Sequence, residues 1–199
     1  MGFVGAEATI CSMTKAATEV QIRRASSQDA LSVASVLRKA FAEYEPLYTK
    51  EGYEATTPGP HAVLTRMSQG PIWVAIHHDE IVGTASVVPK PEGIYVRGMA
   101  VLPAARGLGI GYLLLDEIQR FAEALHSKRL FLSTTPFLSR AISLYEAFGF
   151  ARASEGPHDL FGTPLLTMQK ILCLASRSAK RQEQFAATDR RRVRLSPCQ

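Results

Sequence analysis

The stretch Arg106-Gly107-Leu108-Gly109-Ile110-Gly111 decides the fold of this chain. It places an arginine and three alternating glycines between an apolar segment typical of a strand and a segment with the apolar periodicity of a helix. Glycines let the backbone approach an anion closely, and a following helix directs free N–H groups and the positive end of its dipole toward that anion. No Asp or Glu occurs between residues 93 and 115. The stretch therefore predicts a phosphate-binding loop.

Spacing separates three kinds of phosphate loop. A P-loop ends in Gly-Lys-Ser/Thr, and this chain contains no Gly-Lys pair. A dinucleotide fold needs GxGxxG and an acid about 20 residues later, whereas the glycines here run GxGxG and residues 124–145 hold no acid. A third pattern, Gln/Arg-x-x-Gly-x-Gly/Ala, is met at each fixed position by Arg106, Gly109 and Gly111. A flexible glycine turn into a helix, without a ligand, is the alternative.

The segments on either side favour the third pattern. Residues 95–103 read as a strand closed by a proline, and residues 129–134 as a short buried strand. Between them, apolar residues recur at helical spacing and predict one buried stripe, made of Leu114, Ile118, Phe121 and Leu125. A second helix follows and ends in Leu144-Tyr145-Glu146-Ala147-Phe148-Gly149-Phe150.

The loop and the LYExxGF helix end, in this order and separated by a strand, resemble the two signatures of the GNAT N-acetyltransferase family. The resemblance covers residues 20–172 in the order of elements and is most specific between residues 95 and 150. It implies an α/β fold whose mixed, largely antiparallel sheet of six to seven strands is flanked by helices on both faces. It also implies transfer of an acetyl group from acetyl-CoA to a primary amine of a small molecule, amino acid or peptide, by direct attack.

The rest of the chain can be assigned to elements of such a fold. Residues 20–23 alternate like a strand, and Ser26 or Ser27 can cap the next helix. Its apolar stripe consists of Ala30, Val33, Leu37 and Phe41. Residues 43–70 are predicted to be irregular, with a short helix near residues 61–67. A hairpin follows at residues 72–77 and 81–88, where Gly83 marks a bulge or close contact, and residues 150–154 and 165–172 form two closing strands.

The resemblance assigns roles to particular residues. The pyrophosphate would rest on the loop, and the pantetheine would run beside the strand that ends at Val101. The cofactor-binding residues implied in this way are Met99, Ala100, Val101, Arg106, Gly107, Leu108, Gly109, Ile110, Gly111 and Ser139. A backbone N–H within residues 99–101 would polarise the thioester carbonyl. Tyr145 would protonate the departing CoA thiolate, and a tyrosine buried in the core is its alternative interpretation.

Two departures from the family pattern stand out. Leu138 occupies a position where the family often has an asparagine, so Ser139 or Arg140 would have to replace its contact with pantetheine. The strand at residues 95–101 carries no acid, so the base is water or lies elsewhere. Glu43 and Glu45 are candidates, although a solvated loop explains either one better. These departures keep open a second function, a catalytically weak CoA-binding sensor or interaction domain.

Composition predicts one well-buried domain with flanking segments. The 199 residues are 46% hydrophobic and 21% charged. Residues 171–199 carry seven Lys or Arg and two Asp or Glu, which accounts for the whole formal net charge of +5. We therefore expect a flexible N-terminal extension at residues 1–19, an N-acetyltransferase domain at residues 20–172 and a basic, disordered tail at residues 173–199, with no nucleic-acid partner.

Location and partners follow from other features of the sequence. No apolar run approaches the roughly 20 residues that span a bilayer, and no basic segment followed by an apolar core opens the chain. We expect a cytoplasmic protein without a membrane partner. Its three cysteines are too widely spaced for a disulfide framework or a zinc site, so no metal is expected. The expected partners are acetyl-CoA as co-substrate and an amine acceptor, and an exposed closing strand would allow a homodimer.

Overall fold

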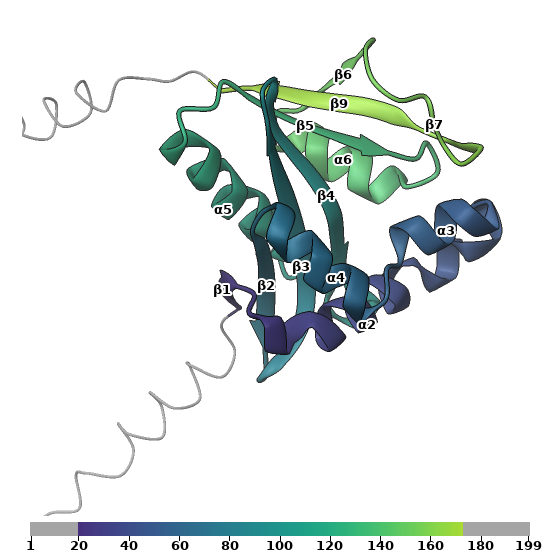
Figure 1. The fold of residues 1–199 in the computed structure, drawn as a ribbon, viewed down its shortest axis with the longest axis vertical. Coiled ribbons are helices and arrows are strands. Elements are labelled where there is room, and N and C mark those ends of the chain that lie inside the picture. The colour runs from purple at the N-terminus through teal and green to yellow at the C-terminus, as the bar shows by residue number, and fades with distance from the viewer. Residues whose placement is uncertain (1–19, 173–199) are drawn as a thin grey trace, which may run out of the picture.

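The computed structural model describes residues 20–172, and the extension and tail predicted at residues 1–19 and 173–199 lie outside the described residues. Seven strands form one sheet in the order β1-β2-β3-β4-β5-β9-β6, in which β4 and β5 are parallel and all other neighbours are antiparallel (Figure 1). The strands are β1 (Gln21–Arg24), β2 (Ile72–His77), β3 (Glu80–Lys90), β4 (Gly93–Val101), β5 (Arg129–Thr134), β6 (Ala151–Ala153) and β9 (Leu166–Ile171). The predicted mixed, largely antiparallel sheet is confirmed. A small hairpin of β7 (Asp159–Leu160) and β8 (Thr163–Pro164), which was not predicted, stands apart from this sheet.

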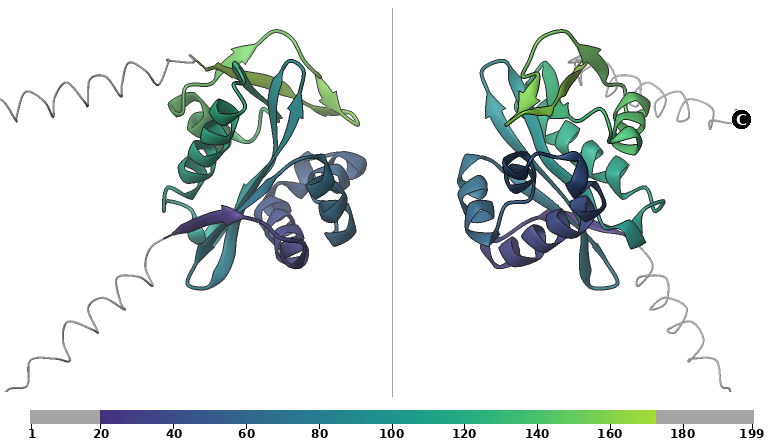
Figure 2. Two further views of the ribbon diagram at one scale, coloured as in Figure 1. Left: turned by 60° about the vertical axis from the view of Figure 1, so that its left-hand side comes forward. Right: turned by 90° about the vertical axis from the view of Figure 1, so that its right-hand side faces the viewer.

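Helices cover both faces of the sheet (Figure 2). On one face lie α2 (Ala30–Phe41) and α4 (Pro60–Gln69), and on the other lie α5 (Ile110–Ala124) and α6 (Ser139–Ala147). Leu114 and Ile118 of the predicted α5 stripe are fully buried, and Phe121 packs against Trp73 at a ring separation of 5.4 Å. Leu125 is 51% exposed, so its assignment to the stripe is wrong. The helix ends at Ala124, and Leu125 lies beyond its last turn.

Residues 43–70 are more regular than predicted. They contain the 3-10 helix η2 (Ala42–Leu47), then α3 (Lys50–Thr56) and α4, and α4 confirms the short helix predicted near residues 61–67. Pro60 stands where a helix tolerates proline, because it is the first residue of α4, directly after the N-cap Gly59. Pro46 lies inside η2. The hydroxyl of Thr49 accepts a hydrogen bond from the Gly52 N–H and caps α3. These helices form one side of the site described below.

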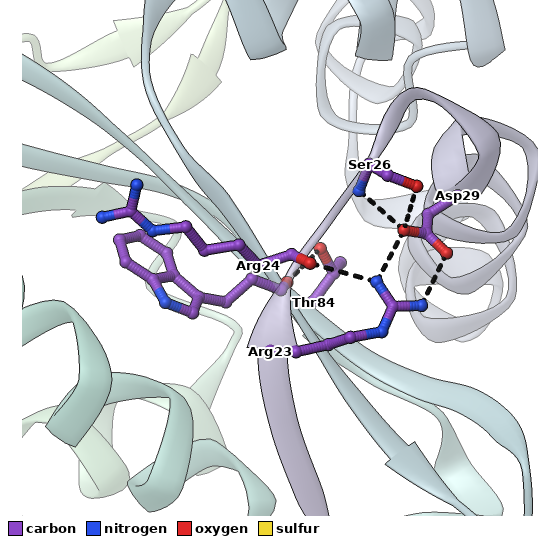
Figure 3. Close-up of polar contacts among 6 residues, drawn as sticks. Arg23, Arg24, Ser26, Asp29 and Thr84 are labelled. Carbon is purple, nitrogen blue, oxygen red and sulfur yellow. Dashed lines mark hydrogen bonds and ion pairs between the residues drawn. The ribbon is translucent and has the colours of Figure 1, made fainter.

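A polar cluster joins β1 to the start of α2, at the short 3-10 helix η1 (Ser27–Asp29) (Figure 3). Arg23 binds both carboxylate oxygens of Asp29, with N–O distances of 2.7 and 2.9 Å. The backbone N–H and the hydroxyl of Ser26 donate to Asp29 Oδ2 at 2.7 and 3.0 Å. The hydrogen bonds from Arg23, followed by those from Ser26, hold the pKa of Asp29 well below its ordinary value despite partial burial. Ser26 is the N-cap of η1, which leads directly into α2, whereas the N-cap of α2 itself is Asp29.

Strands β4 and β5 separate along part of their length. They pair only from Ile94 to Val96 on β4 with Leu130 to Leu132 on β5. Beyond Val96, β4 continues to Val101, but these residues are not paired with residues of β5. On its other edge β4 has a bulge, in which Gly98 and Met99 oppose a single residue of β3, and Gly98 adopts φ +58°. This opening between β4 and β5 positions the candidate site.

Candidate active site

A pocket of about 910 Å³ occupies the opening between β4 and β5. Its wall is built from the unpaired part of β4, the glycine loop, the end of β5 and side chains of α2, α3, α4, α5 and α6. Pockets that hold small molecules in proteins typically measure about 300 to 1,000 Å³. Because β4 lacks a partner on this edge, its backbone polar groups there are available to a ligand, as at the edge of a sheet.

The glycine loop runs from η3 (Pro103–Ala105) into α5 and is shaped by two left-handed glycines. Gly107 has φ +87° and Gly109 has φ +72°, conformations that other residues adopt at a cost. A Cβ added at either position would meet no protein atom within 4 Å. The first N–H groups of α5 have no carbonyl partner within the helix. The loop thus combines open space with free donors, which fits a phosphate group.

The third glycine of the loop has a different role. A Cβ on Gly111 would lie 2.6 Å from Cδ2 of Leu144 on α6. Gly111 therefore lets α5 and α6 approach each other. Gly83 on β3 is a close contact of the same kind, as predicted, because its Cβ would lie 2.9 Å from Cγ2 of Ile110 at the start of α5. Both glycines fix the position of the loop.

Arg106 is held beside the loop by the C-terminal end of α2 and by η2. Its Nη2 lies 2.5 Å from Glu43 Oε1 and 3.4 Å from the Ala40 carbonyl oxygen. An acidic side chain therefore reaches the loop, although residues 93–115 contain none. Glu43 was also a candidate base, but its carboxylate pairs with Arg106, and neither Glu43 nor Glu45 lines the pocket.

Tyr145 is both a core residue and a wall residue, so its two interpretations are compatible. It lies on α6, is 7% exposed, packs against Phe150 and borders the pocket. Burial, and then the neighbouring hydroxyls of Tyr48 and Tyr95, raise the pKa of Tyr145 far above its ordinary value. Its hydroxyl therefore stays protonated at neutral pH, although the same shift makes it a weaker acid than an exposed tyrosine.

The structure brings most of the predicted site residues together. The pocket wall includes Met99, Ala100, Val101, Arg106, Gly107, Gly109, Ile110, Gly111 and Tyr145. Leu108, which is 47% exposed, and Ser139 do not line it. Leu138 and Arg140, the two neighbours of Ser139, do. Arg140 was the alternative to Ser139 on this helix.

Several wall residues were not predicted. Arg66 comes from α4 and Arg97 from β4, and Thr134 and Thr135 come from the end of β5 and the residue after it. An arginine in the middle of the apolar run of residues 93–102 was a signal for Arg97. No comparable signal marked Arg66, because α4 reads as an ordinary surface helix until the chain folds.

The pocket wall carries no acidic residue. Its ionisable side chains are four arginines and five tyrosines: Arg66, Arg97, Arg106, Arg140, Tyr44, Tyr48, Tyr95, Tyr112 and Tyr145. Residues 20–172 also contain no cluster of three His, Cys, Asp or Glu side chains of the kind that holds a metal ion. None of the helices in this part of the chain is long and apolar enough to cross a bilayer.

Comparison with known proteins points to one family. The sequence model of the acetyltransferase (GNAT) family matches residues 34–150. An uncharacterised N-acetyltransferase of Escherichia coli strain K12, YjgM, is 33% identical over 135 residues, which are 65% of this chain and 80% of that protein. An IAA acetyltransferase of Azospirillum brasilense is 35% identical over 97 residues, which are 48% of this chain and 62% of that protein.

Solved structures share the fold. The PaiA N-acetyltransferase of Thermoplasma acidophilum, solved in complex with coenzyme A, has a TM-score of 0.65 at 17% identity over 78% of this chain and all of the other. A GNAT-family acetyltransferase of Staphylococcus aureus Mu50 has a TM-score of 0.64 at 18% identity, with the same coverage of both chains.

Proposed function

The chain belongs to the GNAT acetyltransferase family and is an acetyl-CoA-dependent acyltransferase, and we propose that it acetylates a primary amine in the pocket between β4 and β5. The observation that carries this proposal is the coincidence of three features on one wall. These are an unpaired strand edge, a glycine loop at a helix N-terminus and the protonated hydroxyl of Tyr145. Each suits a different part of a thioester of coenzyme A.

The loop and the strand edge would bind the two parts of acetyl-CoA that do not react. The pyrophosphate would accept hydrogen bonds from N–H groups between Arg106 and Gly111, with added attraction from the guanidinium of Arg106. Arg140 lies on the same pocket wall and would add a second positive charge. The pantetheine amides would pair with β4 between Met99 and Val101, in the place of the missing strand partner.

The thioester would then react by direct attack. The lone pair of the neutral amine forms a bond to the carbonyl carbon, and negative charge develops on the carbonyl oxygen. A backbone N–H of residues 99–101 stabilises that charge because it is fixed in place before the reaction. The carbon–sulfur bond breaks, and the sulfur takes the proton of Tyr145. The acetylated nitrogen releases its own proton, and Tyr145 is reprotonated through water.

The proton of the acceptor ammonium would leave to water. No carboxylate lines the pocket to accept it, and alkylammonium groups have pKa values near 10. The positive charges of Arg66 and Arg97 favour the neutral amine over the ammonium in their vicinity. We therefore expect kcat/KM to rise with pH toward the pKa of the acceptor itself, without the plateau that a carboxylate or histidine base would give.

The proposal extends to the organisation of the chain. Every residue of the pocket wall lies between Ala40 and Leu165. We propose residues 20–172 as the acetyltransferase domain. A cytoplasmic location and a homodimer stay predictions from the sequence.

A transfer assay with two readouts tests the proposed function. The intact protein is incubated with acetyl-CoA and a panel of primary amines, amino acids and short peptides, while free CoA thiol is measured and the products are identified by mass spectrometry. We expect one class of acceptor to yield an N-acetylated product in an amount equal to the CoA released. Binding of CoA without transfer to any acceptor would favour a CoA-binding sensor instead.

A further inference from the structure

Two arginines line the pocket on the side away from the glycine loop. Arg66 lies on α4, and Arg97 is the first residue of β4 beyond the last residue paired with β5, Val96. At a rise of about 3.3 Å per residue, Arg97 lies about 13 Å along the strand from Val101. Residues 99–101, to which the thioester is assigned, therefore stand between Arg97 and the loop. A ligand group bound by Arg97 is on the acceptor side of the thioester.

The two guanidinium groups are anchored on the same side of the pocket, close enough for their charges to interact. Nη2 of Arg66 donates a hydrogen bond of 2.8 Å to the Ala55 carbonyl oxygen at the end of α3. Nη2 of Arg97 donates to Oε1 of Gln69, which lies three residues after Arg66 and so near it on the surface of α4. Nη1 of Arg66 also reaches β4, where it would lie 3.5 Å from a Cβ on Gly98, the neighbour of Arg97 in the chain. The two charges thus converge on one stretch of wall.

Neither charge is balanced within the described part of the chain. The ion pairs among residues 20–172 involve Arg23, Arg106 and Arg120, and not Arg66 or Arg97. Nε of Arg97 is buried without a hydrogen-bond partner there. Burial lowers the pKa of both arginines, and the charge of Arg97 lowers that of Arg66 further. Guanidinium groups nevertheless stay charged in proteins, so two partly buried like charges remain that a bound anion would stabilise.

We infer that Arg66 and Arg97 bind the carboxylate of the acceptor, which is therefore a small molecule carrying both a primary amine and a carboxylate, as free amino acids do. This inference rests on the proposed acetyl transfer and names its substrate class. The planar guanidinium matches a carboxylate with two parallel hydrogen bonds, and Nε of Arg97 supplies a donor that has no other partner. With the carboxylate held there, the amine points along β4 toward residues 99–101.

The rest of the acceptor side is uncharged and is formed by aromatic side chains together with threonines. Tyr48 packs edge-on against Phe137 at a ring separation of 4.9 Å and against Phe41 at 6.3 Å. Phe41, Tyr44 and Tyr48 line the pocket, and no acidic side chain does. A second ammonium or guanidinium on the acceptor would have no partner. The most suitable acceptors are therefore amino acids with uncharged side chains.

Matched acceptors test the inference. Alanine, methionine and phenylalanine are each compared with their amides, which lack the charged carboxylate but keep the amine and the side chain. The amine of an amide is less basic, so more of it is neutral at pH 7, and a preference for the amino acid cannot arise from basicity. We expect kcat/KM to be about 10- to 100-fold higher for the amino acid than for its amide. This is the effect expected when hydrogen bonds to a charged carboxylate are lost. Equal values for all three pairs would overturn the inference.

Variants of the two arginines test whether Arg66 and Arg97 cause the preference for an amino acid over its amide. In Arg97→Gln and in Arg66→Gln, the ratio of kcat/KM for amino acid over amide should fall toward one. Arg152→Gln is the matched control, because Arg152 is an exposed residue of the edge strand β6 and lies outside the pocket. It should keep the ratio of the unchanged protein. Thermal melting of each variant shows that it is folded. A ratio that persists in both pocket variants would contradict the assignment of these two arginines.

A binding measurement separates this inference from the proposed function. Amino acids and their amides are titrated calorimetrically into the intact protein saturated with CoA. If no amine at all is acetylated, the proposed function fails, yet tighter binding of the amino acid, lost in Arg97→Gln, would still support the carboxylate site. If uncharged amines are acetylated and amino acids bind no better than amides, the proposed function stands and this inference is wrong.

Discussion

Tyr145 is the residue whose proposed role in acetyl transfer is tested by removing one oxygen atom. Tyr145→Phe keeps the buried ring and its contact with Phe150, but removes the proton proposed for the CoA thiolate. General acids typically contribute about 10²- to 10⁴-fold, and a thiolate is a good leaving group, so we expect kcat to fall about 10²-fold. The affinity for acetyl-CoA, measured by calorimetry, should stay nearly unchanged.

The control for this substitution is Tyr53→Phe. Tyr53 lies on α3 and packs against Tyr48, but it does not line the pocket, so its hydroxyl should not affect turnover. Unchanged turnover in Tyr145→Phe would remove Tyr145 as the acid and leave it as a core residue only.

Glu43 gives a second test at the scale of one residue. Its carboxylate lies against Arg106, next to the site proposed for the pyrophosphate, and repels that group. Both side chains are partly exposed, so the effect is small, and Glu43→Gln should tighten CoA binding about two- to fivefold in low salt. Calorimetry at two salt concentrations should show the gain shrink as salt screens the charge.

Glu45→Gln removes the same charge from the same 3-10 helix without touching Arg106, and it should leave CoA affinity close to its original value. Weaker binding of CoA by Glu43→Gln in low salt would mean that Glu43 serves chiefly to position Arg106.

For single residues, the sequence was enough to predict chemistry that depends on residues close together in the chain. Arg106, Gly107 and Gly109 form one loop, and their residue types alone indicate its preference for an anion. The contact of Glu43 with Arg106 and the position of Arg66 and Arg97 on one pocket wall bring together residues far apart in the chain. Such contacts depend on how α2 and α4 pack on the sheet, which no short motif encodes. The role of Arg66 and Arg97 on the acceptor side was therefore missed.

Among the elements, the turn into α5 is the one on which the assignment of the pocket depends most. Gly109→Val places a β-branched residue at φ +72° and fills space that the protein leaves open. Backbone strain of about 1–2 kcal/mol and a clash with the bound pyrophosphate should together lower CoA affinity at least tenfold by calorimetry. Gly59→Val is the control, because Gly59 has an ordinary φ of −70° and open surroundings far from the loop in the chain. Retained affinity in Gly109→Val would overturn the assignment of the loop.

The junction of β1 and α2 predicts how stability depends on pH. The pKa of Asp29 is lowered in the folded protein relative to its ordinary value of 3.8, so the ion pair with Arg23 stabilises the fold above that pH. This contribution is lost as the pH falls through 3.8 toward the lower pKa of the folded protein, because the unfolded chain then takes up a proton that the folded state does not yet bind. Asp29→Asn should lower stability at pH 7 by about 1–2 kcal/mol.

Chemical denaturation at several pH values checks this prediction. The difference in unfolding free energy between the original protein and Asp29→Asn should be constant from pH 7 to 5 and shrink below pH 4. A difference that is the same at pH 7 and pH 3 would contradict it. The pair is partly exposed, so the effect should also decrease in high salt.

Elements were predicted best where the apolar period was long and least where helices were short. The stripe of α5 and the alternation of β2 are repeated often enough to identify their elements. In residues 43–70 the prolines masked η2 and α3, whereas the predicted short helix near residues 61–67 lies within α4. A proline at the start of a helix cannot be told from a proline in a loop by composition alone. The two-residue strands β7 and β8 are too short to show any period.

Across the whole molecule, one opening in the sheet relates the fold to its proposed function. The parallel pair β4 and β5 separates after Val96, and the two halves of the sheet with their helices form the walls of the pocket. The order of elements, which the two motifs anchored, was enough to predict this architecture. The volume of the pocket and the charges along its acceptor side depend on packing between distant helices, so they required the structure.

A crystal structure of the protein with coenzyme A tests the central claim most directly. It should show the pyrophosphate on the backbone N–H groups between Arg106 and Gly111, and the pantetheine paired with β4 in the opening beyond Val96. The thiol should lie between residues 99–101 and Tyr145. Coenzyme A bound at another surface, or a pantetheine that leaves the β4 edge unpaired, would contradict the account.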